Sequence, residues 1–357
     1  MSKDFSKKLL RWHEDNPRFL PWKENKNPYH IWLSEIILQQ TRVEQGTPYF
    51  LKFTANYPTV SDLALAPEQQ VMKDWEGLGY YSRARNLHAS AKYINQELNG
   101  KFPETYDDIL KLKGVGAYTA AAIASFAYDL PHAVVDGNVF RVLSRIFGIH
   151  LPIDSTEGKK YFQQKADILL PKDEAAAFNQ AIMNFGATHC KPKKPACDIC
   201  TFNSDCYALK EDLIGELPKK KNKLSKKARY FNYLINTDSG SIQICERKSK
   251  DIWQNLYEFP LYETAKEIPE NQLELLLKKD GILPEKSGIN YLGGSKQTLS
   301  HQIIYAKFYK TELKDTKSPF TIEGSQFVSF TELINFAFPV VIRDFIANNI
   351  YQSSLLL

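Results

Sequence analysis

The sequence predicts two folded regions, a mainly α-helical region over residues 1–217 and an α+β region over residues 229–357. Up to about residue 210, apolar residues recur at spacings of three and four, and Gly and Pro separate these segments. After residue 229 the pattern changes to short alternating runs with turn residues between them. Between the two regions, residues 218–228 are rich in Lys and poor in apolar residues, which is typical of a linker.

The composition fits two folded domains. The chain has 357 residues, 43% of them hydrophobic and 24% charged, and its 46 Lys and Arg against 41 Asp and Glu give a net charge of +5. This length exceeds the roughly 100–200 residues of one typical domain. No apolar stretch is long enough to span a membrane, and the first residues lack the apolar core of a secretion signal. We therefore expect neither a membrane protein nor a secreted one.

The individual elements follow from local patterns. Helical periodicity is clear in residues 31–53, 119–128 and 161–185, and strand patterns are scarce in this region. In the second region, residues 230–236 and 241–247 predict two strands joined by a turn at 237–240. A helix over 271–279 and a strand over 303–310 are expected to follow.

Four of the five cysteines lie close together at Cys190, Cys197, Cys200 and Cys206. Zinc sites more often consist of two C-x2-C pairs, and only one such pair is present. The compact, asymmetric spacing favours a cubane iron–sulfur cluster, in which each iron takes one thiolate. Zinc and four unrelated buried cysteines are the alternatives. The fifth, Cys245, is expected to be a small buried hydrophobic residue.

A turn with two glycines, Gly114-Val115-Gly116, directly precedes an Ala-rich segment. Such a turn presents backbone N–H groups at a helix N-terminus, which suits a phosphate oxygen, although a plain helix–helix connection has the same appearance. About twenty residues later, Asp136 stands between an apolar pair and a glycine. It is a candidate catalytic carboxylate and also a candidate N-cap for a helix beginning near Val139.

Glu35 is a third candidate, because it is nearly the only polar group in an apolar helical stretch. A carboxyl beside Trp32, Ile36 and Leu38 loses solvation of its charged form, so its pKa should rise. A raised pKa makes a carboxyl a candidate general acid near neutral pH. The alternative is a Glu on the polar edge of the helix, pointing to water.

Together and in this order, these features resemble the helix-hairpin-helix DNA glycosylase superfamily, and within it the MutY family of adenine DNA glycosylases. The resemblance implies a six-helix barrel plus an iron–sulfur cluster domain, followed by a Nudix-like domain over 229–357. The matching motifs are WLSEIILQQTRV (32–43), GLGYYSRARNLH (77–88), LKGVGAYTAAAIASFA (112–127), VVDGNVFRVLSR (134–145), AFNQAIMNFGATHC (177–190) and the four cysteines.

The resemblance assigns roles to four catalytic residues. Glu35 would protonate the adenine ring, and Asp136 would stabilise the sugar cation, as two carboxylates do in glycoside hydrolysis. Asn138 and Tyr118 would position the reacting centre. The related endonuclease III branch has at the position of Tyr118 a lysine that forms a Schiff base, and tyrosine cannot form that imine. The resemblance therefore implies an enzyme that excises the base without cutting the strand.

The remaining assignments concern DNA. Gly114, Val115 and Gly116 would hold a backbone phosphate, and the four cysteines a structural [4Fe-4S] cluster in the loop 190–206. Residues matched to base and duplex contacts are Arg18, Trp22, Gln40, Thr41 and Leu78. Two positions depart from the family: Lys113 replaces a Pro, and Asn184 stands where relatives usually have Glu or Asp.

The second region matches the family's Nudix-like domain around IWQNLYEFP (252–260). The glutamates that bind metal in working Nudix enzymes are not present as a motif in 270–279, so we expect binding rather than hydrolysis. In the family, a Phe-Ser-His loop recognises 8-oxoguanine. The matching residues are Leu299, Ser300 and His301, and the leucine can fill space between bases without stacking on them.

The sequence thus predicts a monofunctional, monomeric glycosylase that excises adenine opposite 8-oxoguanine or guanine in double-stranded DNA, after flipping the base out of the helix. The expected location is cytoplasmic, at the nucleoid in a bacterium. Excision of thymine from T:G mispairs, and a non-catalytic iron–sulfur or zinc DNA-binding protein, are the alternatives. Retention of both Glu35 and Asp136 counts against the latter.

Overall fold

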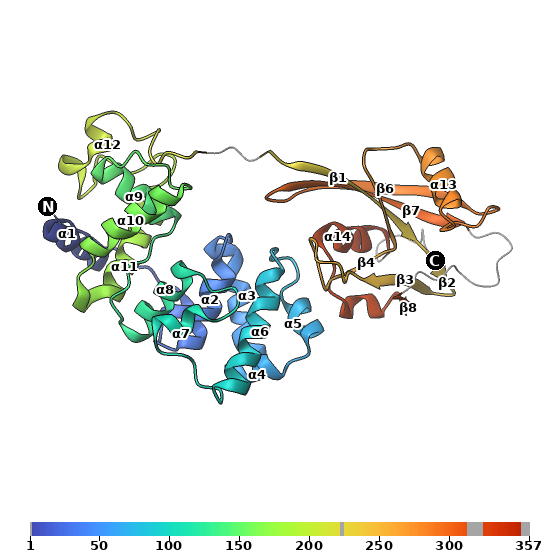
Figure 1. Cartoon of the computed structure of the whole chain (residues 1–357), viewed down its shortest axis with the longest axis horizontal. Coiled ribbons are helices and arrows are strands. Elements are labelled where there is room, and N and C mark those ends of the chain that lie inside the picture. The colour runs from blue at the N-terminus through green and yellow to red at the C-terminus, as the bar shows by residue number, and fades with distance from the viewer. Residues whose placement is uncertain (1, 222–224, 313–323, 351–357) are drawn as a thin grey trace. The chain divides into compact units, whose positions relative to one another are not determined.

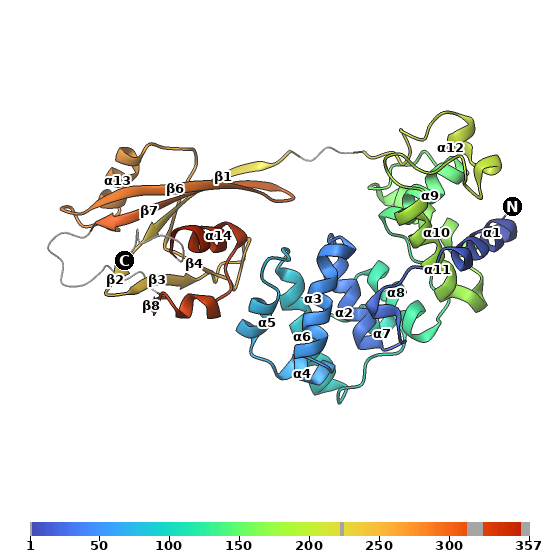
Figure 2. The same ribbon diagram turned by 180° about the vertical axis from the view of Figure 1, so that it is seen from behind.

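A computed structural model of the chain describes residues 2–221, 225–312 and 324–350 (Figures 1 and 2). Parts of the predicted linker (222–224) and of the predicted second domain (313–323 and 351–357) lie outside the described residues. The contacts between residues divide the chain into two units. The first unit comprises Met1–Leu65 and Asn86–Lys223, and the second comprises Ala66–Arg85 and Leu224–Leu357. Residues 66–85 therefore pack with the second unit, although they lie in the range predicted for the first domain.

Within its described residues, the first unit contains helices joined by loops and no β-strand, as the periodicity predicts. Its α-helices are α1 (Ser2–Asp15), α2 (Pro28–Leu38), α3 (Val43–Asn56), α4 (Val60–Leu65), α7 (Tyr106–Leu110), α8 (Ala117–Tyr128), α9 (Gly137–Phe147), α10 (Thr156–Leu169), α11 (Ala175–Asn184) and α12 (Tyr207–Lys210). Helix α6 (Ser82–Glu97) crosses the division between the units. Short 3-10 or π turns are η1 (Pro21–Lys23), η2 (Lys172–Glu174), η3 (Phe185–His189) and η4 (Asn203–Asp205).

Two of the helical segments predicted from the sequence are each divided into two helices in the structure. Residues 31–53 are interrupted after α2, because Gln39 leaves the helical conformation and Gln40 has a φ of 57°. Residues 161–185 are interrupted at Leu170 and Pro171, since proline lacks the N–H that a continuous helix needs. The interruption at Gln39 and Gln40 matters for the site described below. It directs the chain after α2, the helix that carries Glu35, toward the glycine turn 114–116.

The glycine turn joins α7 to α8 in a helix–hairpin–helix arrangement. Gly114 has a φ of 79°, a conformation that L side chains rarely adopt, and an added Cβ would also meet the Asn86 side chain at 2.8 Å. Gly116 is the N-cap of α8 and makes no side-chain cap. The first N–H groups of α8 therefore keep hydrogen-bonding capacity for a ligand.

One hydrophobic core of the first unit is built by α1, α9, α10 and α11, which lie together in Figure 1. Phe5 packs on Phe178 and Phe202, with ring centroids 6.3 and 4.9 Å apart. Cys190 and Cys206 belong to the same core. The cysteine loop is therefore anchored to the helices that follow Asp136.

The second unit contains two mixed or antiparallel sheets. The larger has the order β5-β1-β7-β6, in which β1 and β7 run parallel and the other pairs antiparallel. The smaller has the order β2-β3-β4, with β8 also paired to β3. The strands are β1 (Lys227–Ile235), β2 (Thr237–Asp238), β3 (Ser241–Glu246), β4 (Tyr257–Glu258), β5 (Leu261–Thr264), β6 (Gly288–Thr298), β7 (Gln302–Glu312) and β8 (Ser325–Ser329). The helical elements are α5 (Glu68–Asp74), α13 (Glu270–Lys279), η5 (Glu332–Asn335) and α14 (Val340–Asn349).

Helices α13 and α14 cover opposite faces of the larger sheet (Figure 1). Leu273 and Leu277 of α13 pack on Leu234 and Tyr309, whereas Phe345 of α14 stacks on Phe308 at 3.9 Å. Neighbouring residues of β7 thus contact different helices, as the alternation of a strand requires. Within the described residues, no helix is both long and apolar enough to cross a membrane.

Candidate active site

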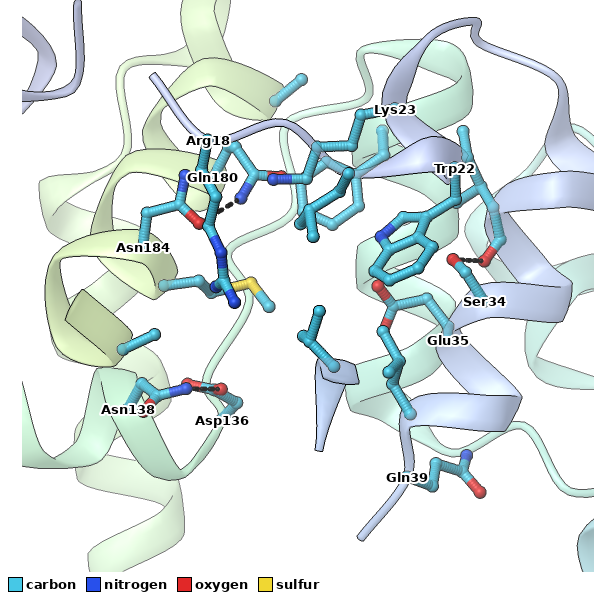
Figure 3. A pocket seen from close by; sticks show the side chains of 18 of the residues that line it. Arg18, Trp22, Lys23, Ser34, Glu35, Gln39, Asp136, Asn138, Gln180 and Asn184 are labelled. Carbon is cyan, nitrogen blue, oxygen red and sulfur yellow. Dashed lines mark hydrogen bonds between the residues drawn. The ribbon is translucent and has the colours of Figure 1, made fainter. Parts of the chain in front are cut away.

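A cavity of about 720 Å³ in the first unit is lined by all four predicted catalytic residues (Figure 3). These residues are Glu35, Tyr118, Asp136 and Asn138. They come from three helices that are distant in the sequence, so folding brings them to one place. The side chains labelled in Figure 3 place Glu35 under the Trp22 indole on one wall, and Asp136 with Asn138 on another.

Glu35 lies on the inner face of α2 and is 9% exposed, so the interpretation that it points to water is wrong. Helix α2 begins at the N-cap Asn27, whose side chain accepts from the N–H groups of Tyr29 and His30. Burial raises the pKa of Glu35 to about 7, while a hydrogen bond from Tyr118 opposes the shift. A carboxyl with this pKa holds a proton in a large fraction of molecules at neutral pH, as a general acid must.

Asp136 is the N-cap of α9, as predicted, although the helix begins at Gly137 rather than near Val139. Its carboxylate accepts from the Val139 N–H at 2.7 Å and from Asn138 Nδ2 at 2.8 Å. Burial raises the pKa of Asp136, and these hydrogen bonds together with the Arg141 charge act against the rise. The ionised form of Asp136 is thus stabilised by several hydrogen-bond donors and a positive charge, whereas the ionised form of Glu35 has fewer such partners.

Tyr118 interacts with both carboxylates. It lies in the first turn of α8, close after Gly116, and its hydroxyl hydrogen-bonds Glu35. Burial raises its pKa well above the ordinary value, and the charges of Glu35 and Asp136 add to this. The phenol therefore stays neutral and can only donate to or accept from its neighbours.

The lining of the cavity was predicted in part. Arg18 and Trp22 belong to it, as the resemblance implies, together with Lys23, Gln180 and Asn184. Gln180 Nε2 donates to Asn184 Oδ1 at 3.1 Å. No sequence pattern singles out Lys23 or Gln180, because both occupy ordinary turn or helical positions and only the fold brings them together.

The loop after α2 contacts the glycine turn. Gln39 Nε2 donates to Thr119 Oγ1 at 3.2 Å and lies 3.5 Å from the Gly114 carbonyl oxygen. Thr41 lines the cavity, whereas Gln40 is exposed outside it. Gly114 and Gly116 are also exposed, with Val115 buried between them. The turn that is predicted to hold a phosphate therefore lies one hydrogen bond away from the end of the helix that carries Glu35.

The four cysteines of the loop 190–206 surround one small cavity, together with Ile146 and Phe185. Cys190 and Cys206 are buried, and Cys197 and Cys200 are partly exposed. Among the described residues, no three His, Cys, Asp or Glu side chains are arranged to hold a single metal ion. Four thiols lining a common cavity are the donor set of a cubane cluster, in which each iron takes one thiolate, and equally of a tetrahedral zinc site.

Two buried arginines that were not predicted as site residues connect this loop to Asp136. Arg145 donates to the carbonyl oxygens of Lys191, Pro192 and Leu217, and its Nη1 lies 3.5 Å from Cys190 Sγ. One turn earlier on α9, Arg141 donates to the Cys190 and Gly186 carbonyls and to Asn138 Oδ1. The sequence signal that could have identified them is a pair of arginines four residues apart on an otherwise apolar helix face.

The second unit holds the remaining predicted residues. Leu299, Ser300 and His301 form the turn between β6 and β7, where the Leu299 N–H donates to the Gln302 carbonyl at 2.8 Å. Leu78 belongs to the same unit and is 5% exposed. Two residues further on, the Tyr80 hydroxyl hydrogen-bonds the Ser300 hydroxyl. Leu78 therefore does not line the cavity that holds Glu35, but the segment it belongs to contacts the predicted recognition turn.

Comparison with family profiles finds two matches. Residues 33–168 match a profile described as HhH-GPD superfamily base excision DNA repair protein, and residues 231–348 match a NUDIX domain. The first range contains Glu35, Tyr118, Asp136 and Asn138. The second covers most of the described β-strands.

Relatives and solved structures agree with these profiles. The chain is 36% identical over 304 residues to the adenine DNA glycosylase of Buchnera aphidicola subsp. Baizongia pistaciae, covering 84% of each protein. It is 39% identical over 222 residues to the mouse adenine DNA glycosylase, covering 60% of this chain and 43% of that protein. A thermostable thymine-DNA glycosylase of known structure superposes with a TM-score of 0.55 at 30% identity, covering 59% of this chain and 97% of that one.

Proposed function

Since the chain belongs to the MutY family of adenine DNA glycosylases and excises adenine from DNA in base excision repair, we propose that its substrate is adenine mispaired with 8-oxoguanine or guanine. In this proposal Glu35 is the acid that protonates the adenine, and Asp136 is the anion that stabilises the sugar cation. The observation that carries this proposal is the cavity that contains both carboxyls. Burial raises the pKa of both, to about 7 for Glu35, but only Asp136 accepts hydrogen bonds from a backbone N–H and from an amide, which favour its ionised form. This difference is what an acid and a cation-stabilising anion require.

The reaction begins with placement of the DNA. Backbone N–H groups at the glycine turn and the start of α8 bind a phosphate, which positions the duplex without reading its sequence. The adenine must leave the base stack to enter a cavity of this kind. Trp22, which is 6% exposed and packs on Phe50 at 5.4 Å, supplies a rigid apolar wall for the purine.

The bond between C1′ of the sugar and N9 of adenine then breaks. Glu35 donates its proton to a nitrogen of the adenine ring, so the base leaves as neutral adenine with the bonding electrons. The positive charge that develops on the sugar is stabilised by the Asp136 carboxylate. A water molecule adds to C1′ and releases a proton, giving an abasic site. Tyr118 offers no amine for an imine, so the strand stays intact.

We further propose that Cys190, Cys197, Cys200 and Cys206 hold a [4Fe-4S] cluster. Four thiols around one cavity supply the four thiolates that such a cluster takes, and their spacing, with a single C-x2-C pair, favours it over zinc. Bound there, the cluster would supply a structural cross-link within the loop 190–206. Arg141 and Arg145 would transmit that rigidity to α9 and so to Asp136. Exposed Lys191, Lys193 and Lys194 in the loop provide positive charge for phosphates.

The opposite base is assigned to the second unit. The β6–β7 turn presents Ser300 and His301 to solvent, and both side chains can hydrogen-bond the edge of 8-oxoguanine. The hydroxyl of Tyr80 hydrogen-bonds the hydroxyl of Ser300. Monomeric action and a location at the nucleoid remain predictions from the sequence.

Thymine excision is the rival activity, because a thymine-DNA glycosylase is a structural neighbour of this chain. That similarity covers 59% of the chain, whereas the similarity to the Buchnera adenine enzyme covers 84%. A single experiment separates the two activities. Duplexes with A:8-oxoG, A:G and T:G pairs are incubated with excess protein, and base release is followed after alkali.

We expect release from A:8-oxoG and A:G and none above background from T:G. Glu35→Gln should slow release by a factor of about 10² to 10⁴, the usual contribution of a general acid, while the affinity for the duplex stays within a few fold. Undiminished release by the Gln variant would disprove the role of Glu35. Faster release from T:G than from A:8-oxoG would disprove the substrate.

A further inference from the structure

The cavity contains a buried amine that has no part in the proposed steps of base excision. Lys23 lines the cavity next to Trp22, and its Nζ is buried without a hydrogen-bond partner among the described residues. A buried amine without partners is costly, since the protein forgoes hydration of the ammonium and gains no hydrogen bond. Such a group is expected where it acts on something else in the same cavity.

The surroundings of Lys23 define what it can act on. In Figure 3 its side chain extends from the Trp22 side of the cavity in the direction of Gln180 and Asn184, which are neutral. These two amides cannot neutralise an ammonium group. Within the part of the chain that the structure describes, the charged and titratable groups that interact with Lys23 are Arg18, His13 and Glu35. Glu35 is the acid among them.

The charge of each group counteracts the effect of burial on the pKa of the other. Burial lowers the pKa of Lys23 to about 7, and the nearby Arg18 adds to the effect, while Glu35 acts against it. For Glu35, burial raises the pKa to about 7, Tyr118 lowers it, Asp136 raises it and Lys23 lowers it. Both groups therefore change charge in the same pH range, and the proton of one depends on the charge of the other.

We infer that Lys23 is a positioning residue for the catalytic proton: while it is charged it favours ionised Glu35, and when it is neutral it lets Glu35 keep the proton for the base. Control by Lys23 rests on the proposed role of Glu35 as the acid. It goes beyond that role because the acid is regulated by a second residue, one whose own charge is not fixed at neutral pH.

Two substitutions of Lys23 should have effects of opposite sign. Lys23→Met keeps most of the volume and removes the charge, so Glu35 should remain protonated to higher pH. Lys23→Arg keeps the charge at every pH at which the enzyme works, so Glu35 should lose its proton at lower pH. The upper limb of the pH–rate profile is the fall in rate at high pH as Glu35 loses its proton. This limb should move to higher pH by about one unit in Lys23→Met and to lower pH by a similar amount in Lys23→Arg.

The test measures single-turnover release of adenine from an A:8-oxoG duplex, with full-length protein in saturating excess, between pH 5 and 10. Lys160 provides the control, because it is exposed on α10 and does not line the cavity. Lys160→Met and Lys160→Arg should leave the limb where it is in the wild type. Thermal unfolding of each variant identifies any loss of folding.

Opposite shifts in the two Lys23 variants support the inference. Limbs that stay in place, or that move in the same direction, overturn it, even if the rates fall, because a purely structural lysine would change the rate and not the position of the limb. If Lys23→Met does not fold, Lys23→Arg decides the question alone through its downward shift. Glu35→Gln is measured beside them: activity in that variant would overturn the role of the acid itself, independently of Lys23.

Discussion

Glu35 and Asp136 carry the same functional group in one cavity, and burial raises the pKa of both, yet the fold gives them different partners. Glu35 projects from the middle of α2 into apolar surroundings and receives one hydroxyl as a partner. Asp136 precedes α9 and receives a backbone N–H, an amide and the charge of Arg141. The position within a helix therefore decides how many hydrogen bonds the ionised carboxylate receives, because helix interiors offer no N–H groups to a side chain and helix N-termini do.

Among the substitutions that change the partners of the two carboxyls, the largest effect is expected from removing the charge of Asp136 while keeping its cap. Asn caps a helix about as well as Asp, so Asp136→Asn should change the free energy of unfolding by less than about 0.5 kcal/mol. The rate of adenine release should fall about 10²- to 10³-fold, because an amide does not balance the sugar cation. Chemical denaturation and single-turnover kinetics measure the two quantities, and a variant that remains fully active would show that α9 needs only its cap.

The next effect concerns Arg145, which joins the cysteine loop to α9, the helix that Asp136 caps. Arg145 is 2% exposed and donates to three carbonyl oxygens of the cysteine loop and its continuation. Arg145→Met leaves these carbonyls without their donor, which should lower the free energy of unfolding by about 3 kcal/mol and reduce the iron bound per protein. Denaturant unfolding and iron analysis test this. Unchanged values for both would mean that the loop is held without α9.

A smaller effect is expected at the link between the carboxyls. The Tyr118 hydroxyl favours ionised Glu35, so Tyr118→Phe should raise the pKa of Glu35 further. An acid with a higher pKa keeps its proton longer as the pH rises, so the upper limb of the pH–rate profile should move to higher pH. The maximal rate should fall by about tenfold or less, since one hydrogen bond is lost. A limb that moves to lower pH would contradict the hydrogen bond to Glu35.

The smallest effect is predicted at the DNA phosphate. Nothing lies within 4 Å of a Cβ added to Gly116, so Gly116→Ala should fold normally. The methyl group would face the bound backbone and should weaken binding to any duplex a few fold without changing which base is released. Titration of duplexes with and without the mispair measures this. Weakening confined to the mispaired duplex would indicate that the turn contacts the base rather than the phosphate.

Local patterns in the sequence were enough to predict several parts of this site. The N-cap at Asp136 and the helix after Gly116 follow from a few neighbouring residues, and both are confirmed. Whether Glu35 faces the interior depends on the rotation of α2 against α8, which the short apolar stretch left open. Lys23 and Asn184 are far apart in the sequence, so no local pattern indicates that they share a cavity.

The same limit applies to the second unit. Strands β1, β3 and β7 and helix α13 lie within a few residues of their predicted positions, because their apolar residues alternate or repeat clearly. Strand β6 was not predicted, since most of its residues are exposed or partly exposed and it alternates weakly. Its pairing with β7, from Lys296 opposite Tyr305 to Thr298 opposite Ile303, is nevertheless what shapes the Ser300 turn.

A titration of Glu35 itself decides whether this carboxyl can act as the acid. Protein with ¹³C-labelled glutamate carboxyls is titrated by NMR, and the Glu35 signal is identified as the one missing from the Glu35→Gln variant. Because burial raises the pKa of Glu35 to about 7, we expect its midpoint near that pH, with the proton still largely in place at neutral pH. A midpoint near the ordinary glutamate value of about 4.3 would contradict this role, because the carboxyl would then have no proton to give to the base.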